Sequence, residues 1–143
     1  MKDQLAEAAI NEYINNGVDS PYYLMLFKNT NDEYMSELLA KLTTHFINEN
    51  ISFMHINGAD FCEWDDTCFN EAMDKLSECD FLIFEDVQYI ADNDIAQQFL
   101  YLMYNKFYLK VYMIFTADCD LYHINIQERI RSRLFRALKI DFM

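Results

Sequence analysis

The chain has 143 residues, 52% of them hydrophobic, and its 24 acidic residues against 11 Lys and Arg give a net charge of −13. This length and composition fit one globular domain. Nucleic-acid backbones require a basic surface, so the charge argues against direct DNA binding and favours a protein partner. No apolar run approaches the roughly 20 residues of a membrane span, and the acidic N-terminus is unlike a signal peptide. We therefore expect a cytoplasmic protein that is not bound to a membrane.

Hydrophobic periodicity predicts helices and strands that alternate along the whole chain. In chain order we expect a helix over 2–16 that Gly17 ends, a strand over 22–27, a helix over 33–49, a strand over 51–56, an irregular or helical segment to 64, a helix capped by Asp66 that ends near 77, a strand over 81–84, a helix capped by Asn93 or Asp94 that reaches about 107, a strand over 111–115, a helix over 126–135 and a strand over 137–142.

This alternation predicts an α/β fold, a three-layer sandwich in which a five-stranded parallel sheet has helices on both faces. One domain should span 1–143, with an N-terminal helix over 1–17 and a core over 20–142. Only 2 Gly and 1 Pro are present, so Asn and Asp are expected to make the turns. The four cysteines have no zinc-ligand spacing, so we expect free thiols and no metal.

An acidic pair, Glu85 and Asp86, directly follows the apolar strand over 81–84. Nucleotide-hydrolysing proteins place such acids at the carboxyl end of a buried parallel strand, where they hold magnesium and orient a water molecule. A strand that simply meets solvent can end in the same way. The pair therefore indicates a nucleotide-type site only in combination with other motifs.

The segment between the first strand and the next helix is where a phosphate loop, G-x-x-x-x-G-K-[ST], would lie. It contains no glycine and carries Asp32 and Glu33, which would repel a triphosphate. Alignment on the following leucine pair puts Met35 at the lysine position and Ser36 at the hydroxyl position. Only the hydroxyl remains of the motif, so we expect no cofactor and neither ATP nor magnesium binding.

Two further segments follow in the second half of the chain. The strand over 111–115 runs into Thr116 and Asp118, which are suited to contact a phosphate or a water, or simply to end a strand. Arg129 and Arg133 lie four residues apart and so share a helical face. They form either a solvated basic face or arginines presented to the phosphate of a neighbouring molecule.

The order of these motifs resembles the α/β subdomain of AAA+ ATPases, most of all the branch of the bacterial replication initiator DnaA and its regulatory relative Hda. The resemblance covers about 20–142 and rests on three segments, FLIFEDVQYIAD, FTADCDLYHI and QERIRSRLFRALKIDF. It implies Walker B acids at Glu85 and Asp86, sensor 1 at Thr116 or Asp118, an arginine finger at Arg133 with Arg129 beside it, and a sheet order of 5-1-4-3-2. The chain departs from the family in its Walker A loop, and we expect neither a helical lid nor a DNA-binding domain.

The leading hypothesis is a non-catalytic protein that binds a DnaA-type initiator and regulates the initiation of DNA replication through protein–protein contact. It would either cap an initiator assembly or present Arg133 to the initiator's ATP. A homodimer is also open, as is a structural interaction protein that uses the aromatic residues Tyr101, Tyr104, Phe107 and Tyr108. A divergent nucleotide-binding ATPase or switch would use Glu85, Asp86 and Ser36. A phospho-receiver-like domain would use Asp86 as acceptor, with Thr116 and Lys139.

Overall fold

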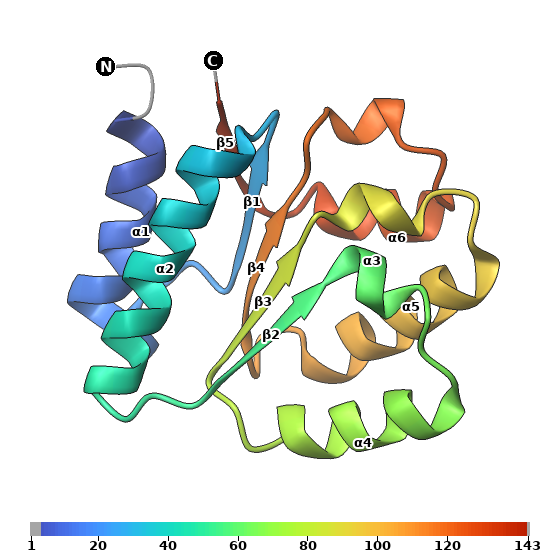
Figure 1. Cartoon of the computed structure of the whole chain (residues 1–143), viewed down its shortest axis with the longest axis horizontal. Helices are drawn as coiled ribbons and strands as arrows, with labels where there is room; N and C mark the ends of the chain where they lie inside the picture. The colour runs from blue at the N-terminus through green and yellow to red at the C-terminus, as the bar shows by residue number, and fades with distance from the viewer. Residues whose placement is uncertain (1–3, 143) are drawn as a thin grey trace.

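The computed structural model describes residues 4–142, which form one sheet covered by helices on both faces (Figure 1). The strands are β1 (Leu24–Lys28), β2 (Phe53–Asn57), β3 (Phe81–Glu85), β4 (Tyr112–Thr116) and β5 (Leu138–Asp141). The α-helices are α1 (Gln4–Asn16), α2 (Asp32–Asn48), α3 (Gly58–Phe61), α4 (Asp66–Leu76), α5 (Asp94–Phe107) and α6 (Glu128–Leu134). Three short 3₁₀ helices join them, η1 (Gly17–Asp19), η2 (Val87–Ile90) and η3 (Leu121–His123).

All strand pairs are parallel, and the order across the sheet is β2-β3-β4-β1-β5. This confirms the α/β fold and the order 5-1-4-3-2 that the resemblance implies. It also shows that the receiver-like alternative is wrong, because flavodoxin-like folds of that kind have the order 2-1-3-4-5. In this chain β1 lies between β4 and β5. Because β3 pairs with β4, Asp86 and Thr116 lie at the ends of adjacent strands.

Two hydrophobic cores lie on opposite faces of the sheet. One is packed beneath α1 and α2 and contains Tyr13, Phe27, Phe46 and Phe81. The other lies beneath α3 to α6 and includes Phe84 and other large side chains. The central strands β3 and β4 are buried along nearly their whole length because helices cover both faces, which explains their continuous apolar sequence. No helix among residues 4–142 has the length and apolar content needed to cross a membrane.

The element predictions are confirmed in type, and most boundaries differ by one to three residues. Positions 2 and 3 of the predicted first helix lie outside the described residues. The predicted cap at Asp66 is wrong: Oδ1 of Asp65 accepts the N–H of Cys68 at 2.8 Å and begins α4 one residue earlier. Asn93 caps α5 as predicted. The turns do use Asn and Asp. Of the five non-glycine residues with positive φ in the described range, four are Asn or Asp (Asn29, Asn50, Asp86 and Asp92), and the fifth is Leu109.

Tyr112 connects β4 to the segment that precedes β1. Its hydroxyl lies 2.7 Å from the carbonyl oxygen of Val18 and 2.6 Å from that of Ser20, and its ring stacks on Tyr23. We expect Tyr112→Phe to lower the free energy of unfolding by about 1–2 kcal/mol, because it leaves the carbonyl of buried Ser20 without this donor. Urea denaturation measures the change; Tyr122→Phe, at a hydroxyl on an exposed ring, is the control and should have little effect.

Tyr112 should also make the free energy of unfolding change with pH in the alkaline range. Burial, together with Tyr23, raises the pKa of Tyr112 from 10.0 to about 12. The folded state therefore holds the phenolic proton more tightly than the unfolded state, and this contribution is complete below pH 10 and lost as the pH rises toward 12. The difference between wild type and Tyr112→Phe should shrink over that range, and a difference that stays constant would contradict the assignment.

Candidate functional site

The carboxyl ends of parallel strands form the edge at which open α/β sheets bind ligands. In this structure the main-chain N–H of Asp86, after β3, donates to the hydroxyl of Thr116, at the end of β4, at 2.8 Å. The main-chain N–H of Asp118 donates to Oε1 of Gln88 at 3.2 Å. The two segments that resemble Walker B and sensor 1 are thus joined by direct hydrogen bonds.

The two acids of the pair contact different elements. Oε1 of Glu85 lies 2.9 Å from Nε2 of His55 in β2. Asp86 has a φ of 63°, so the chain turns sharply after β3 and enters η2. Gly58 packs against this turn so closely that a Cβ there would lie 2.1 Å from the main-chain oxygen of Asp86. The backbone of the acidic pair is therefore held by contact with the start of α3.

Negative charge surrounds Asp86. Burial raises the pKa of Asp86 above its ordinary value of 3.8, and the charges of Glu85, Asp32 and Asp118 raise it further, against the opposite effect of a hydrogen bond with Gln88. Within the described range, no three or more His, Cys, Asp or Glu residues are arranged to hold a metal ion. The flanking carboxylates oppose the approach of a phosphate to this edge of the sheet.

The connection between β1 and α2 has three residues, 29–31. The N–H and the hydroxyl of Thr30 both donate to the carbonyl of Ala117, each at 3.1 Å, which ties the connection to the end of β4. The side chain of Asn31 accepts the N–H of Tyr34 and caps α2. Met35 is buried in the core and Ser36 is exposed on α2. In phosphate-binding folds the main-chain N–H groups at such a helix N-terminus donate to the phosphate. Here the side chain of Asn31 already accepts one of them, the N–H of Tyr34.

Neutralising Asp86 is expected to stabilise the protein. The raised pKa means that the folded state favours the protonated acid, so stability is lost as the pH rises from 3.8 through the pKa of the folded state. Asp86→Asn removes the charge, and Asn tolerates the positive φ. Its melting temperature should exceed that of wild type at pH 7, and the gain should disappear near pH 3. Asp74→Asn, at an exposed position of α4, is the matched control; an equal gain there would show that net charge alone is responsible.

The arginine pair forms a second feature, on α6 against α5. The guanidinium carbons of Arg129 and Arg133 lie 4.0 and 4.7 Å from the ring centre of Tyr101. Nε of Arg133 donates to Oδ1 of Asn105 at 3.0 Å, and its Nη1 donates to the carbonyl of Arg129 at 2.7 Å. The prediction that the two arginines share a face is confirmed, since both guanidinium groups lie against the ring of Tyr101.

The aromatic residues of α5 divide between core and surface. Tyr104 and Phe107 are buried in the core beneath α3 to α6, so these two do not form a surface. Tyr108 stacks on Tyr104 with ring centres 4.9 Å apart, and the guanidinium of Arg136 lies 6.0 Å from the Tyr108 ring. Tyr101 and Tyr108 are partly exposed, and arginines lie against both. We call Tyr101, Tyr108, Arg129, Arg133 and Arg136 the arginine edge.

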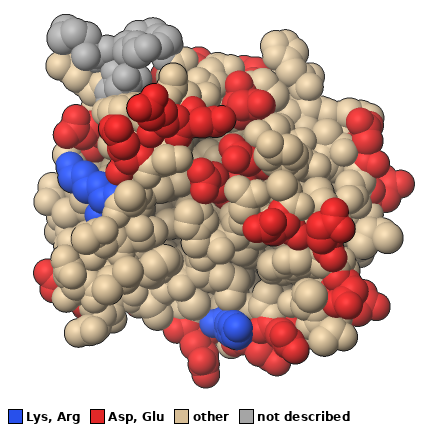
Figure 2. Space-filling view, viewed as in Figure 1, with Lys and Arg blue, Asp and Glu red and all other residues tan. Residues whose placement is uncertain are grey.

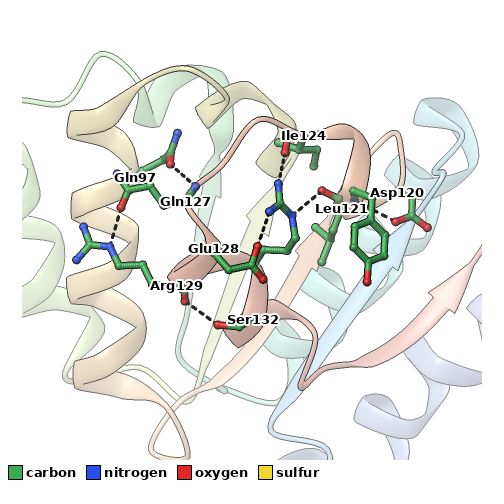
Figure 3. Close-up of polar contacts among 10 residues, drawn as sticks. Gln97, Asp120, Leu121, Ile124, Gln127, Glu128, Arg129 and Ser132 are labelled. Carbon is green, nitrogen blue, oxygen red and sulfur yellow. Dashed lines mark hydrogen bonds and ion pairs between the residues drawn. The ribbon is translucent and has the colours of Figure 1, made fainter.

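Sequence reasoning missed two side chains that position this edge (Figure 3). Arg131, between the arginine pair, donates to the carbonyls of Leu121 at 3.3 Å and Ile124 at 2.8 Å, and it forms an ion pair with Glu128 at 2.7 Å. It therefore holds the connection between β4 and α6. In the sequence Arg131 simply alternates with Arg129 and Arg133, and nothing in that pattern indicates that its role is structural.

The other is Gln97 on α5, which is buried. Its Oε1 accepts the N–H of Gln127, the residue before α6, at 2.8 Å, and its Nε2 donates to the carbonyl of Ile90 at 3.1 Å. The carbonyl of Asn125 lies 3.5 Å from the same nitrogen. One side chain thus joins η2, α5 and the start of α6. A glutamine within the apolar stripe of α5 was the available signal in the sequence.

Neither a protein-family model nor a curated protein sequence matches the chain. Solved structures do. DnaA of Aquifex aeolicus bound to AMPPCP is 18% identical, with a TM-score of 0.86 over 98% of this chain and 46% of that one. Domain III of Thermotoga maritima DnaA is 18% identical, with a TM-score of 0.79 over 99% of this chain and 62% of that one. DnaI is 13% identical, with a TM-score of 0.74 over 97% and 80%.

The chain thus spans about half the length of the Aquifex DnaA chain to which it is similar. At these identities, similarity of structure establishes the fold and leaves activity open. The sheet order agrees with it. The chain has a DnaA-like AAA+ fold.

Proposed function

We propose that this protein is a non-catalytic DnaA-like domain that binds an AAA+ replication initiator and regulates the initiation of DNA replication through protein–protein contact. The observation that carries the proposal is the three-residue connection between β1 and α2. A phosphate loop has about six residues before its lysine, and residues 29–34 stand there when Met35 is aligned with the lysine, but 32–34 already belong to α2. The lysine position holds Met35, whose side chain lies in the core. These features support a role without ATP hydrolysis.

The arginine edge is the proposed contact with the initiator. Tyr101 and Asn105 hold the guanidinium of Arg133 at the surface, and planar guanidinium groups recognise phosphates through paired N–H donors. One of the similar proteins is a DnaA bound to AMPPCP, a nucleotide whose phosphates an arginine of this kind would face. We infer that Arg133 reaches the initiator's nucleotide and that Arg129, which also lies against the Tyr101 ring, supports it.

A binding experiment with the DnaA-type initiator of the same host tests the proposal. Wild type, Arg133→Ala and Lys41→Ala are compared by surface plasmon resonance in the presence of ATP. Arg133→Ala should weaken binding by about tenfold or more, as expected for an interface hot spot. Lys41→Ala removes the same charge from an exposed site on α2 and should bind like wild type. Failure of wild type to bind would overturn the proposal, and equal binding of all three would remove Arg133 from the contact.

Calorimetric titration with ATP and magnesium tests the alternative of a nucleotide switch. We expect no saturable heat up to millimolar nucleotide, because carboxylates surround the edge at which phosphates would lie. Saturable binding below millimolar concentration that Ser36→Ala or Asp86→Asn weakens would assign the protein to that class instead.

A further inference from the structure

A second surface lies at the other side of the sheet, on the open edge of β2. Among the described residues this strand pairs only with β3, and it is the outermost strand of the sheet in Figure 1. The carbonyl of Ser52 accepts N–H groups of Asp80 and Phe81 at 2.9 and 3.2 Å, so it faces β3. Main-chain groups alternate in direction along a strand. Those of Phe53 and His55 therefore face away from β3, toward solvent.

A groove of about 360 Å³ runs between β2 and α4. On the strand side it is lined by Met54 and Ile56, with Trp64 beyond them. On the helix side it is lined by residues at helical spacing, among them Cys68 and Glu71. The outward main-chain groups and this groove, which has both apolar and polar lining residues, lie along the same five-residue strand. An added strand would thus find both hydrogen-bond partners and pockets for alternate side chains.

The charge around the groove is predominantly negative. Asp60 and Glu71 lie on its rim, and His55 at the open edge is already paired with Glu85. Lys75 is the basic residue of the lining. Figure 2 shows the molecule in the same view as Figure 1, and acidic side chains are spread over much of this face. Such a surface favours a positively charged occupant.

We propose that the groove between β2 and α4 binds an extended, basic segment of a partner protein, which adds to the sheet as a strand next to β2. Alternate apolar side chains of the segment would enter the groove beside Met54 and Trp64, and its Lys or Arg side chains would meet Asp60 and Glu71. The site uses neither the arginine edge nor the acidic pair as ligands. It therefore goes beyond the proposed contact with an initiator.

The test uses a six-residue peptide of alternating lysine and valine, blocked at both ends, and amide NMR spectra of the labelled full chain. Shifts should concentrate on β2 and on the outward face of α4. The corresponding glutamate–valine peptide should bind at least about tenfold more weakly, because like charges would then face one another. Weakening of the lysine peptide's binding by added salt should accompany this difference.

Two substitutions at one position separate main-chain pairing from side-chain effects. His55→Pro removes the outward N–H and is tolerated on an edge strand, whereas His55→Ala keeps that N–H while also losing the pair with Glu85. Peptide affinity should fall about tenfold or more in His55→Pro relative to His55→Ala. Glu71→Lys, on the exposed face of α4, should weaken the lysine peptide without disturbing the fold.

Several outcomes would overturn the proposal. Equal affinity in His55→Pro and His55→Ala, in folded proteins, would exclude added-strand pairing. Shifts confined to elements other than β2 and α4, or no shifts at millimolar peptide, would remove the site. If His55→Pro proves unfolded, unchanged binding by Glu71→Lys decides against the proposal. A dimer of the free protein that His55→Pro dissociates would assign the edge to a second copy of the chain rather than to a basic partner.

Discussion

Gly58→Ala is expected to lower the free energy of unfolding by about 3 kcal/mol, as overpacking against rigid backbone does. The added Cβ would lie 2.1 Å from the main-chain oxygen of Asp86, 3.0 Å from its carbonyl carbon and 3.2 Å from the oxygen of Glu85. These are backbone atoms at the end of a buried strand, so they cannot move aside as a flexible side chain would. Either α3 must shift away from the sheet or the turn after β3 must change.

Urea denaturation followed by circular dichroism measures this loss. Gly17→Ala is the control, because Gly17 has a φ of 52° but no atom within 4 Å of the position a Cβ would take. That substitution should cost only about 1 kcal/mol, from backbone strain alone. A Gly58→Ala protein no less stable than Gly17→Ala would show that α3 does not press on the acidic pair as described.

Gln97→Leu is expected to lower the free energy of unfolding by about 2–3 kcal/mol. Leucine fills a similar volume but leaves the N–H of Gln127 and the carbonyl of Ile90 without their partner, and unpaired buried polar groups are unfavourable. Because Gln97 joins α5 to the start of α6, the substitution should also loosen the arginine edge. Amide hydrogen exchange in Gln97→Leu, relative to wild type, should therefore accelerate more in α6 than in α2.

The adjacent glutamine provides the control. Gln98 is exposed, and its Oε1 accepts from Arg129 at 2.5 Å. Gln98→Leu should change stability by less than about 0.5 kcal/mol, as for most surface substitutions. If the two leucine variants were equally stable, the buried glutamine would not connect the helices in the way its three contacts indicate.

The sequence was sufficient to predict the strands and helices because each carries a clear local signal. The run over 81–84 is continuously apolar because β3 is buried on both faces, and Asn93 stands immediately before the helix that it caps. The strand order, in contrast, came from resemblance. Alternation of strands and helices fits several orders, and only long-range pairing such as that of β1 with β4 and β5 selects one.

The details of the candidate site depended on tertiary contacts that have no local signal. The spacing of Arg129 and Arg133 predicts that they share one face, but Tyr101, the ring that both contact, belongs to another helix. The close approach of Gly58 to Asp86 joins residues far apart in the chain. Residues of similar appearance also have different roles, since Arg131 binds main-chain carbonyls while its neighbours face Tyr101.

These contacts suit the arginine edge, but not the acidic pair, to an interaction with a phosphate. Asp86 lies among like charges, so its ionised form destabilises the fold and its position does not favour a phosphate. Arg133 is oriented at the surface by groups of α5 and α6. We therefore propose that the protein acts on an initiator through Arg133, without a contribution from Asp86.

The rate of ATP hydrolysis by the initiator of the same host, measured with and without this chain, tests that claim most directly. An arginine supplied by a partner raises the rate by roughly 10³–10⁵ in GTPases, so wild type should raise it by at least about tenfold. Asp86→Asn should act like wild type, and Arg133→Ala should lose the effect. Full activity of Arg133→Ala together with loss in Asp86→Asn, or no response to the wild-type chain, would contradict the account.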